Sequence, residues 1–172
     1  MKLTLSEEQL QKQVRYFGYY QLANGIIAIL YICWTLAQVE RLSGLLLLSY
    51  VGFFGLTSFA SYCGYATLKQ PPRGLQLARA SLATQFLWFA VGGFSFQFFI
   101  GPYLALGLNL TTEVLFKLNF NLAGLSFYFS NNSTDLLLSV NVVAMLLFLR
   151  TTLWLNEWQM RYGNSEPAAS SV

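Results

Sequence analysis

Residues 16–39 read YFGYYQLANGIIAILYICWTLAQV and contain no Lys, Arg, Asp or Glu. A helix of about 20 apolar residues is long enough to cross the hydrocarbon core of a bilayer, so this stretch predicts a membrane-spanning helix. Two further stretches, 42–68 and 80–112, also lack charged residues, and a fourth apolar run, 136–155, is interrupted only by Arg150. Together the four runs predict an integral membrane protein.

The composition agrees with this interpretation and excludes one class of partner. Of the 172 residues, 55% are hydrophobic and 10% are charged, whereas soluble domains carry about 25% charged residues. A soluble chain this apolar would expose large apolar patches and aggregate. The net charge of +3 is small and scattered along the chain, which does not fit a nucleic-acid-binding surface. We therefore expect the lipid bilayer, and not nucleic acid, as a partner.

Histidine is absent from the sequence. Its absence removes the usual haem ligand, the commonest metal ligand and the favoured general base. Cys33 and Cys63 both fall inside apolar runs, and their spacing is not that of a zinc, haem or redox site. We interpret both as small packing residues, and we expect no cofactor and no metal ion.

The turn signals divide the chain into four expected spans. Ser6 and Gln9 have the spacing of a capping box, which predicts a helix start. Glu40-Arg41 makes a short polar turn, and the two prolines within 69–74 end the second helix because proline lacks an N–H donor. The fold class predicted is an all-α four-transmembrane-helix bundle. It has spans at about 16–39, 44–68, 76–100 and 135–156 in one domain over 1–160, followed by a disordered polar tail at 161–172.

The positive charges predict the orientation of these spans. Short cytoplasmic flanks carry an excess of Lys and Arg. With four spans, one side of the membrane holds Arg41 and Lys117, and the other holds Lys2, Lys12, Arg15, Lys69, Arg73, Arg79, Arg150 and Arg161. Both termini are therefore expected in the cytoplasm, with the chain in a plasma membrane or a bacterial inner membrane.

The third connection contains a different pattern. Apolar and polar residues alternate over 114–122 and again over 125–130, with Ala123-Gly124 between them. Period two around a glycine-containing turn predicts a β-hairpin, which we place on the exterior side at about 113–130. An isolated hairpin is marginally stable in water, so its apolar face should contact a partner, the bundle or lipid headgroups. The candidate partner-facing residues are Phe116, Phe120, Phe127 and Phe129.

Each expected span also carries a stripe of small or polar residues. Small residues let membrane helices approach closely, and amides bond across such seams. The first interpretation is that these stripes pack the bundle. A second is that they form an interface with another subunit. The third is a polar cavity for a solute or ion, lined by Gln21, Asn24, Gln85 and Asn141.

No catalytic motif is present, and no charged residue lies in the middle of a span, which argues against proton or ion coupling. Our leading hypothesis is a non-enzymatic membrane protein that acts through protein–protein interaction. It would be an accessory or assembly subunit of a membrane complex, or a homo-oligomer. The alternative is a small channel or transporter for a neutral or weakly polar solute. An enzyme acting on lipid at the exterior interface ranks last.

Overall fold

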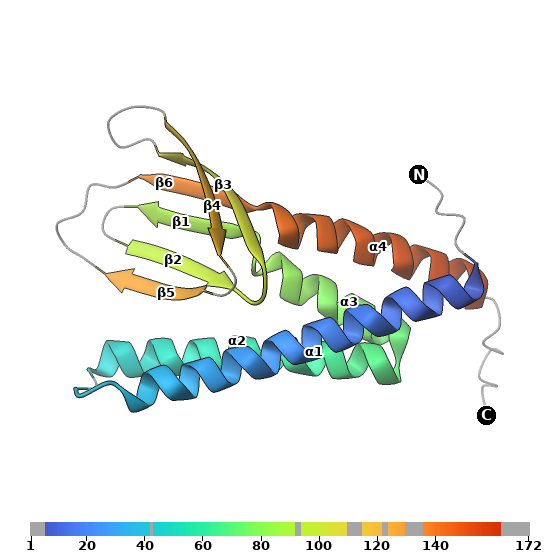
Figure 1. The fold of residues 1–172 in the computed structure, drawn as a ribbon, viewed down its shortest axis with the longest axis horizontal. Coiled ribbons are helices and arrows are strands. Elements are labelled where there is room, and N and C mark those ends of the chain that lie inside the picture. The colour runs from blue at the N-terminus through green and yellow to red at the C-terminus, as the bar shows by residue number, and fades with distance from the viewer. Residues whose placement is uncertain are drawn as a thin grey trace, which may run out of the picture.

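The computed structural model describes residues 6–41, 43–91, 94–109, 115–121, 124–129 and 136–162. The described chain is mostly helical and contains one sheet (Figure 1). The helices are α1 (Glu7–Ala37), α2 (Gly44–Lys69), α3 (Pro71–Ala83) and α4 (Val142–Tyr162). The strands are β1 (Leu87–Val91), β2 (Phe94–Phe99), β3 (Tyr103–Asn109), β4 (Leu115–Asn121), β5 (Gly124–Phe129) and β6 (Leu137–Asn141).

α1 and α2 form a long antiparallel pair, and both are long and apolar enough to cross a membrane. The predicted capping box at Ser6 and Gln9 is confirmed. Only 22% of the most apolar window of α1 and 17% of that of α2 is buried within the chain. The core helix of a soluble protein is largely covered by its own chain, whereas most residues in these two windows are not buried.

The predicted helix over 76–100 is wrong, and the one over 135–156 is correct only in its second part. The first range divides into α3, β1 and β2, and the second contains β6 followed by α4. Hydropathy alone cannot distinguish an apolar helix from a buried strand. The aromatic and alternating character of Phe94–Phe99, read FSFQFF, favours a strand. The four-span helical bundle is therefore not confirmed.

The sheet corrects the predicted exterior hairpin. β4 and β5 are strands, as predicted, but the strand order is β4-β3-β6-β1-β2-β5, so they lie at opposite ends of it. β4 pairs with β3, and β5 pairs with β2, all antiparallel. The sequence predicts a helix where β1 and β2 lie, so it offers no strand there with which β5 could pair. Residues 113, 114, 122, 123, 130 and 163–172 of the predicted hairpin and tail lie outside the described residues, and Arg161 and Tyr162 belong to α4.

The sheet must be rolled. Asn121 ends β4 and Gly124 begins β5, and three trans peptide steps span at most about 11 Å. The outer strands of a flat six-stranded sheet would be about 24 Å apart. A second observation agrees: the rings of Phe99 on β2 and Tyr103 on β3 stack with centroids 3.9 Å apart, although β6 and β1 lie between their strands.

The two faces of the rolled sheet differ in character. The concave face is more enclosed: Tyr103 is 2% exposed and Ser139 is 1% exposed. Ser95, Gln97 and Asn119 on this face are half-buried. The convex face is apolar and largely open, with Leu106 at 56%, Leu118 at 67% and Phe120 at 69% exposed. The register assigns the described side chains to these faces. The convex set is Phe89, Val91, Phe98, Leu104, Leu106, Leu108, Leu118, Phe120, Leu138 and Val140, and the concave set includes Ser95, Gln97, Ala105, Gly107, Asn119, Ser139 and Asn141.

Part of the convex face packs on α1 and α2. Phe98 is 2% exposed because it contacts Ile32 and stacks with Phe53 at a centroid distance of 6.2 Å. α3 and α4 pack against the other half of the α1–α2 pair, where a core cluster draws on all four helices. The sheet and the α1–α2 turn thus lie at one end of the molecule, and the start of α1 and the end of α4 lie at the other (Figure 1).

We expect Gly64→Ala to destabilise the α1–α2 pair. A Cβ at Gly64 would lie 2.5 Å from the backbone nitrogen of Leu22, so the helices would have to separate, and overpacking costs about 1–3 kcal/mol. Gly44→Ala, at the start of α2, is the matched control because no neighbouring atom lies within 4 Å of its added Cβ, and it should keep or slightly raise the stability. Thermal unfolding in detergent measures both. Equal stability of the two variants would contradict this packing.

Candidate functional site

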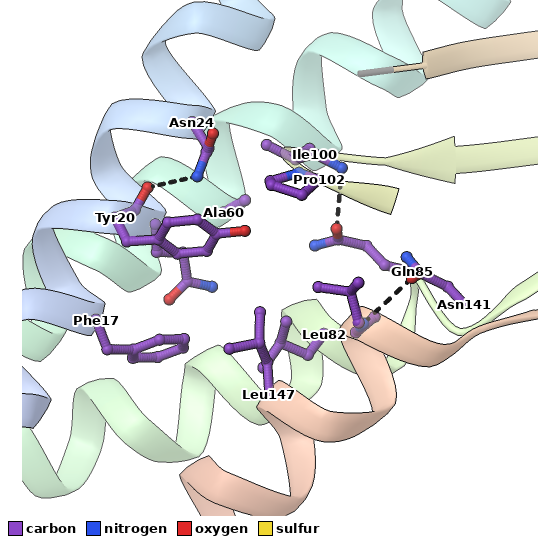
Figure 2. Close-up of a pocket in the computed structure, with 13 residues that line it drawn as sticks. Phe17, Tyr20, Asn24, Ala60, Leu82, Gln85, Ile100, Pro102, Asn141 and Leu147 are labelled. Carbon is purple, nitrogen blue, oxygen red and sulfur yellow. Dashed lines mark hydrogen bonds between the residues drawn. The ribbon is translucent and has the colours of Figure 1, made fainter. Parts of the chain in front are cut away.

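The structure brings the four candidate amides to one small space. Gln21, Asn24, Gln85 and Asn141 all border a single space where the base of the rolled sheet meets the helices. Figure 2 shows side chains from α1, α3, α4 and the β2–β3 link converging on this space. The remaining lining residues are Phe17, Tyr20, Ala60, Leu82, Ile100, Pro102, Val143, Ala144 and Leu147.

Two of the amides join elements of the fold. The side-chain oxygen of Gln85 accepts a hydrogen bond from the Ile100 N–H at 3.0 Å, which ties the end of α3 to the β2–β3 link. The side-chain oxygen of Asn141 accepts from the Ala144 N–H at 3.2 Å, so it caps the N-terminus of α4. The Asn141 N–H itself donates to the Phe86 carbonyl at 2.8 Å. These two side chains hold the helix–sheet junction together.

Asn24 and Gly101 meet at the same junction. The side-chain amide of Asn24 donates to the Tyr20 carbonyl at 2.9 Å. Gly101 has φ +86, and a Cβ there would lie 2.8 Å from the Tyr20 hydroxyl oxygen and 3.1 Å from Cγ of Asn24. Both the positive φ and the lack of space require glycine at this position. The β2–β3 link therefore contacts α1 directly.

Gln21 differs from the other three amides. It is 6% exposed, and neither its side-chain oxygen nor its nitrogen has a hydrogen-bond partner among the described residues. A buried unpaired amide is costly, and native proteins usually satisfy such groups with ordered water. The space open to the centre of a water-sized molecule is about 20 Å³, enough for about one water. The cavity therefore has the size and polarity to hold a single water against Gln21.

A larger groove adjoins this cavity between α1 and α4. Its volume is about 530 Å³, it is open along one side, and Phe17, Tyr20, Pro102, Val143 and Leu147 line both spaces. Its other end is bordered by Gln13, Tyr16, Arg150 and Trp154. In the sequence, Arg150 only interrupts the fourth apolar run, and no local pattern singles out Gln13 or Trp154. Their convergence depends on how α1 and α4 cross, which no local pattern indicates.

The structure places the candidate partner-facing phenylalanines on two strands, β4 and β5, that are not neighbours in the strand order. Phe120 is exposed on the convex face of β4. In the backbone register Phe116 lies opposite Leu108, Phe127 opposite Phe96 and Phe129 opposite Phe94, and the side chains of these three lie outside the described part. Phe116 and Phe120 thus belong to one end of the strand order, and Phe127 and Phe129 to the other.

The described residues contain no group of three His, Cys, Asp or Glu side chains that could hold a metal ion. Cys33 is exposed, Cys63 is buried, and the two are not bonded to each other.

No known family model matches the sequence, and neither a curated protein nor a solved structure resembles it.

We expect Gln85→Leu to destabilise the helix–sheet junction. The change leaves the part-buried Ile100 N–H without its acceptor, and an unsatisfied buried donor costs about 1–3 kcal/mol. Gln38→Leu is the control, because Gln38 is exposed at the end of α1. Denaturant unfolding in detergent, followed by circular dichroism, gives the difference. A Gln85→Leu protein as stable as the control would show that this bond does not hold the junction.

Proposed function

We propose that the chain is a multi-pass integral membrane protein that acts without catalysis, through contacts with other membrane proteins. It would serve as an accessory or assembly subunit of a membrane complex, or as a homo-oligomer. The apolar character of the outer surface is the observation that supports a membrane location. Uncovered apolar residues continue from α1 and α2 onto the convex face of the sheet. A sheet in water has the opposite arrangement, with polar residues on its open face.

The dimensions support this placement. Residues 16–37 of α1 carry no charge and extend for ~33 Å as a helix, which matches the ~30 Å hydrocarbon core. Gly101, at the base of the sheet, is beside Asn24, ~12 Å along that stretch. Strands of 5 to 7 residues cover a further ~17–23 Å. In this arrangement part of α3 and the first part of α4 lie in the half of the bilayer nearer the termini, and the rolled sheet occupies the other half.

Rolling of the sheet lessens a difficulty that this placement would otherwise raise, although β4 and β5 are not paired with each other among the described residues. Open sheet edges do not occur in contact with lipid, because no water is present to satisfy their N–H and C=O groups. Barrels in membranes solve this problem by closure and place apolar residues outward. The short β4–β5 connection brings the two outermost strands together at the base of the sheet, and the convex face is apolar.

The charge distribution supports an orientation with both termini in the cytoplasm. Lys12 and Arg15 on α1, Lys69 and Arg73 at the α2–α3 turn, and Arg161 on α4 lie at the end of the molecule opposite the sheet. Arg41 lies in the α1–α2 turn, at the sheet end. Under the positive-inside rule, the sheet half faces away from the cytoplasm. A plasma membrane or a bacterial inner membrane fits this orientation.

Two glycines on α2 support the interaction part of the proposal. Gly18, Gly25 and Gly64 pack tightly within the α1–α2 seam, whereas Gly52 and Gly55 are exposed with no atom within 4 Å of an added Cβ. Glycine in a helix interior costs about 1 kcal/mol relative to alanine. In membranes such residues let a second helix approach closely. The exposed glycines mark the face of α2 on which another subunit or a second copy would pack.

We expect Gly55→Leu to weaken association while leaving the monomer folded. The added side chain enters open space in the monomer but would prevent close approach of a partner helix. Cross-linking in native membranes, followed by purification in mild detergent, measures the fraction of the protein held in complexes or oligomers. That fraction should fall severalfold in the variant.

Ala23→Leu is the matched control, since Ala23 is exposed on α1, and it should leave the complexes intact. A wild-type protein that is strictly monomeric, or complexes that persist unchanged in Gly55→Leu, would overturn the proposed interface on α2.

A second candidate function is passage of a small neutral solute, and the unpartnered Gln21 amide favours it. The limited space around Gln21 restricts that solute to about the size of water. Vesicles carrying the wild-type protein should then shrink faster under osmotic stress than empty vesicles, and Gln21→Leu should abolish the difference. Identical shrinkage rates with and without the wild-type protein would eliminate this candidate.

A further inference from the structure

We propose that the groove between α1 and α4 is a binding site for an anionic phospholipid, with the phosphate at Arg150 and an acyl chain lying along the apolar part. This inference rests on the proposed membrane location and adds a specific ligand to it. The groove is about 530 Å³ and is open along one side, so a lipid can enter it laterally from the bilayer.

The polar end of the groove is built around Gln13. Its side-chain oxygen accepts hydrogen bonds from Nη2 of Arg150 and Nε1 of Trp154, both at 3.1 Å. The Arg150 guanidinium carbon also lies 5.6 Å from the Trp154 ring centroid. These contacts fix the guanidinium and engage one of its five N–H donors. The donors that remain suit the oxygens of a phosphate, which arginine binds in a bidentate manner.

Arg150 has no counter-ion among the residues that the structure describes. The ion pair found among the described residues joins Arg161 to Glu157, near the end of α4, and no carboxylate pairs with Arg150 there. A part-buried cation beside apolar surface favours an anionic partner. Basic pockets between membrane helices on the cytoplasmic side are typical sites for anionic headgroups. Charge complementarity therefore selects an anionic lipid over a neutral one and over an uncharged partner helix.

The apolar part of the groove fits an acyl chain. From Arg150 to Val143 the lining of α4 extends ~11 Å, so it covers most of the ~15 Å that one leaflet contributes to the hydrocarbon core. Phe17, Leu147 and Pro102 line this part. The polar end lies towards the termini and the apolar end towards the middle of the proposed bilayer position. A phospholipid of the cytoplasmic leaflet has the same direction, headgroup first and chains inward.

The test compares binding of two lipids with identical chains. The delipidated protein in detergent is titrated with dioleoylphosphatidylglycerol or dioleoylphosphatidylcholine, and retained lipid is measured by native mass spectrometry. A single arginine contact with an anionic headgroup predicts about a fivefold preference for phosphatidylglycerol. Arg150→Gln should remove the preference, and Arg150→Lys should keep most of it.

Arg161→Gln is the control for the loss of one positive charge, because Arg161 lies outside the groove lining, and it should leave the preference unchanged. Leu147→Trp fills the apolar part and should reduce retention of both lipids. Unfolding temperatures of all variants identify any that fail to fold. If Arg150→Gln fails to fold, the test rests on Arg150→Lys. Equal retention of the two lipids by the wild type, or an unchanged preference in Arg150→Gln, would overturn the proposal.

Failure of the membrane location is a separate outcome. Extraction of membranes with alkaline carbonate reports whether the protein is integral, whichever lipid it binds. A protein released into the supernatant contradicts the proposed function. A protein that stays in the pellet and shows no lipid preference contradicts only the lipid site.

Discussion

Two residues of chain separate Asn121 from Gly124, and this short link joins the two strands at opposite ends of a six-stranded sheet. Covalent geometry holds those strand ends within about 11 Å, so the sheet has to roll. Rolling determines which side chains are enclosed: Tyr103, Ala105 and Ser139 lie on the concave face, and Leu106 and Leu118 lie outside. The apolar exterior, the buried base and the junction with the helices all depend on this constraint.

The helix–sheet junction depends on a second constraint, which is that buried backbone groups need hydrogen-bond partners. Where β6 gives way to α4, the start of the helix leaves N–H groups without intrahelical partners, and next to the end of α3 the Ile100 N–H of the β2–β3 link also needs an acceptor. Asn141 caps α4, and Gln85 accepts from Ile100. These two amides therefore satisfy backbone N–H groups at the points where the chain passes between helix and sheet. Gln21 is the exception, because its amide has no partner among the described residues.

The sequence was informative about α1 and α2 because their signals are local. A long apolar run, a capping box at Ser6 and a polar turn at Glu40 predict helices whose bounds agree closely with those observed. The amide set was also predicted as a group, since polar residues in apolar segments gather away from lipid. The sequence does not predict the sheet, because an apolar run of helical length is ambiguous between helix and strand, and the alternation within Phe94–Phe99 is too short to decide between them. The pairing of β4 and β5, and the meeting of Gln13 with Arg150, depend on long-range contacts that no local pattern contains.

The central claim is that the convex face of the rolled sheet lies in lipid. Spin labels at Leu118 and Leu106, introduced as single cysteines with Cys33 and Cys63 replaced by alanine, test it in reconstituted vesicles. Electron paramagnetic resonance measures collisions of each label with oxygen, which concentrates in the bilayer, and with a water-soluble nickel complex. Both labels should collide readily with oxygen and be shielded from nickel, as should a label at Leu30 on the exposed face of α1. Nickel accessibility at Leu118 and Leu106 equal to that of a label at Glu40, in the α1–α2 turn, would contradict the account.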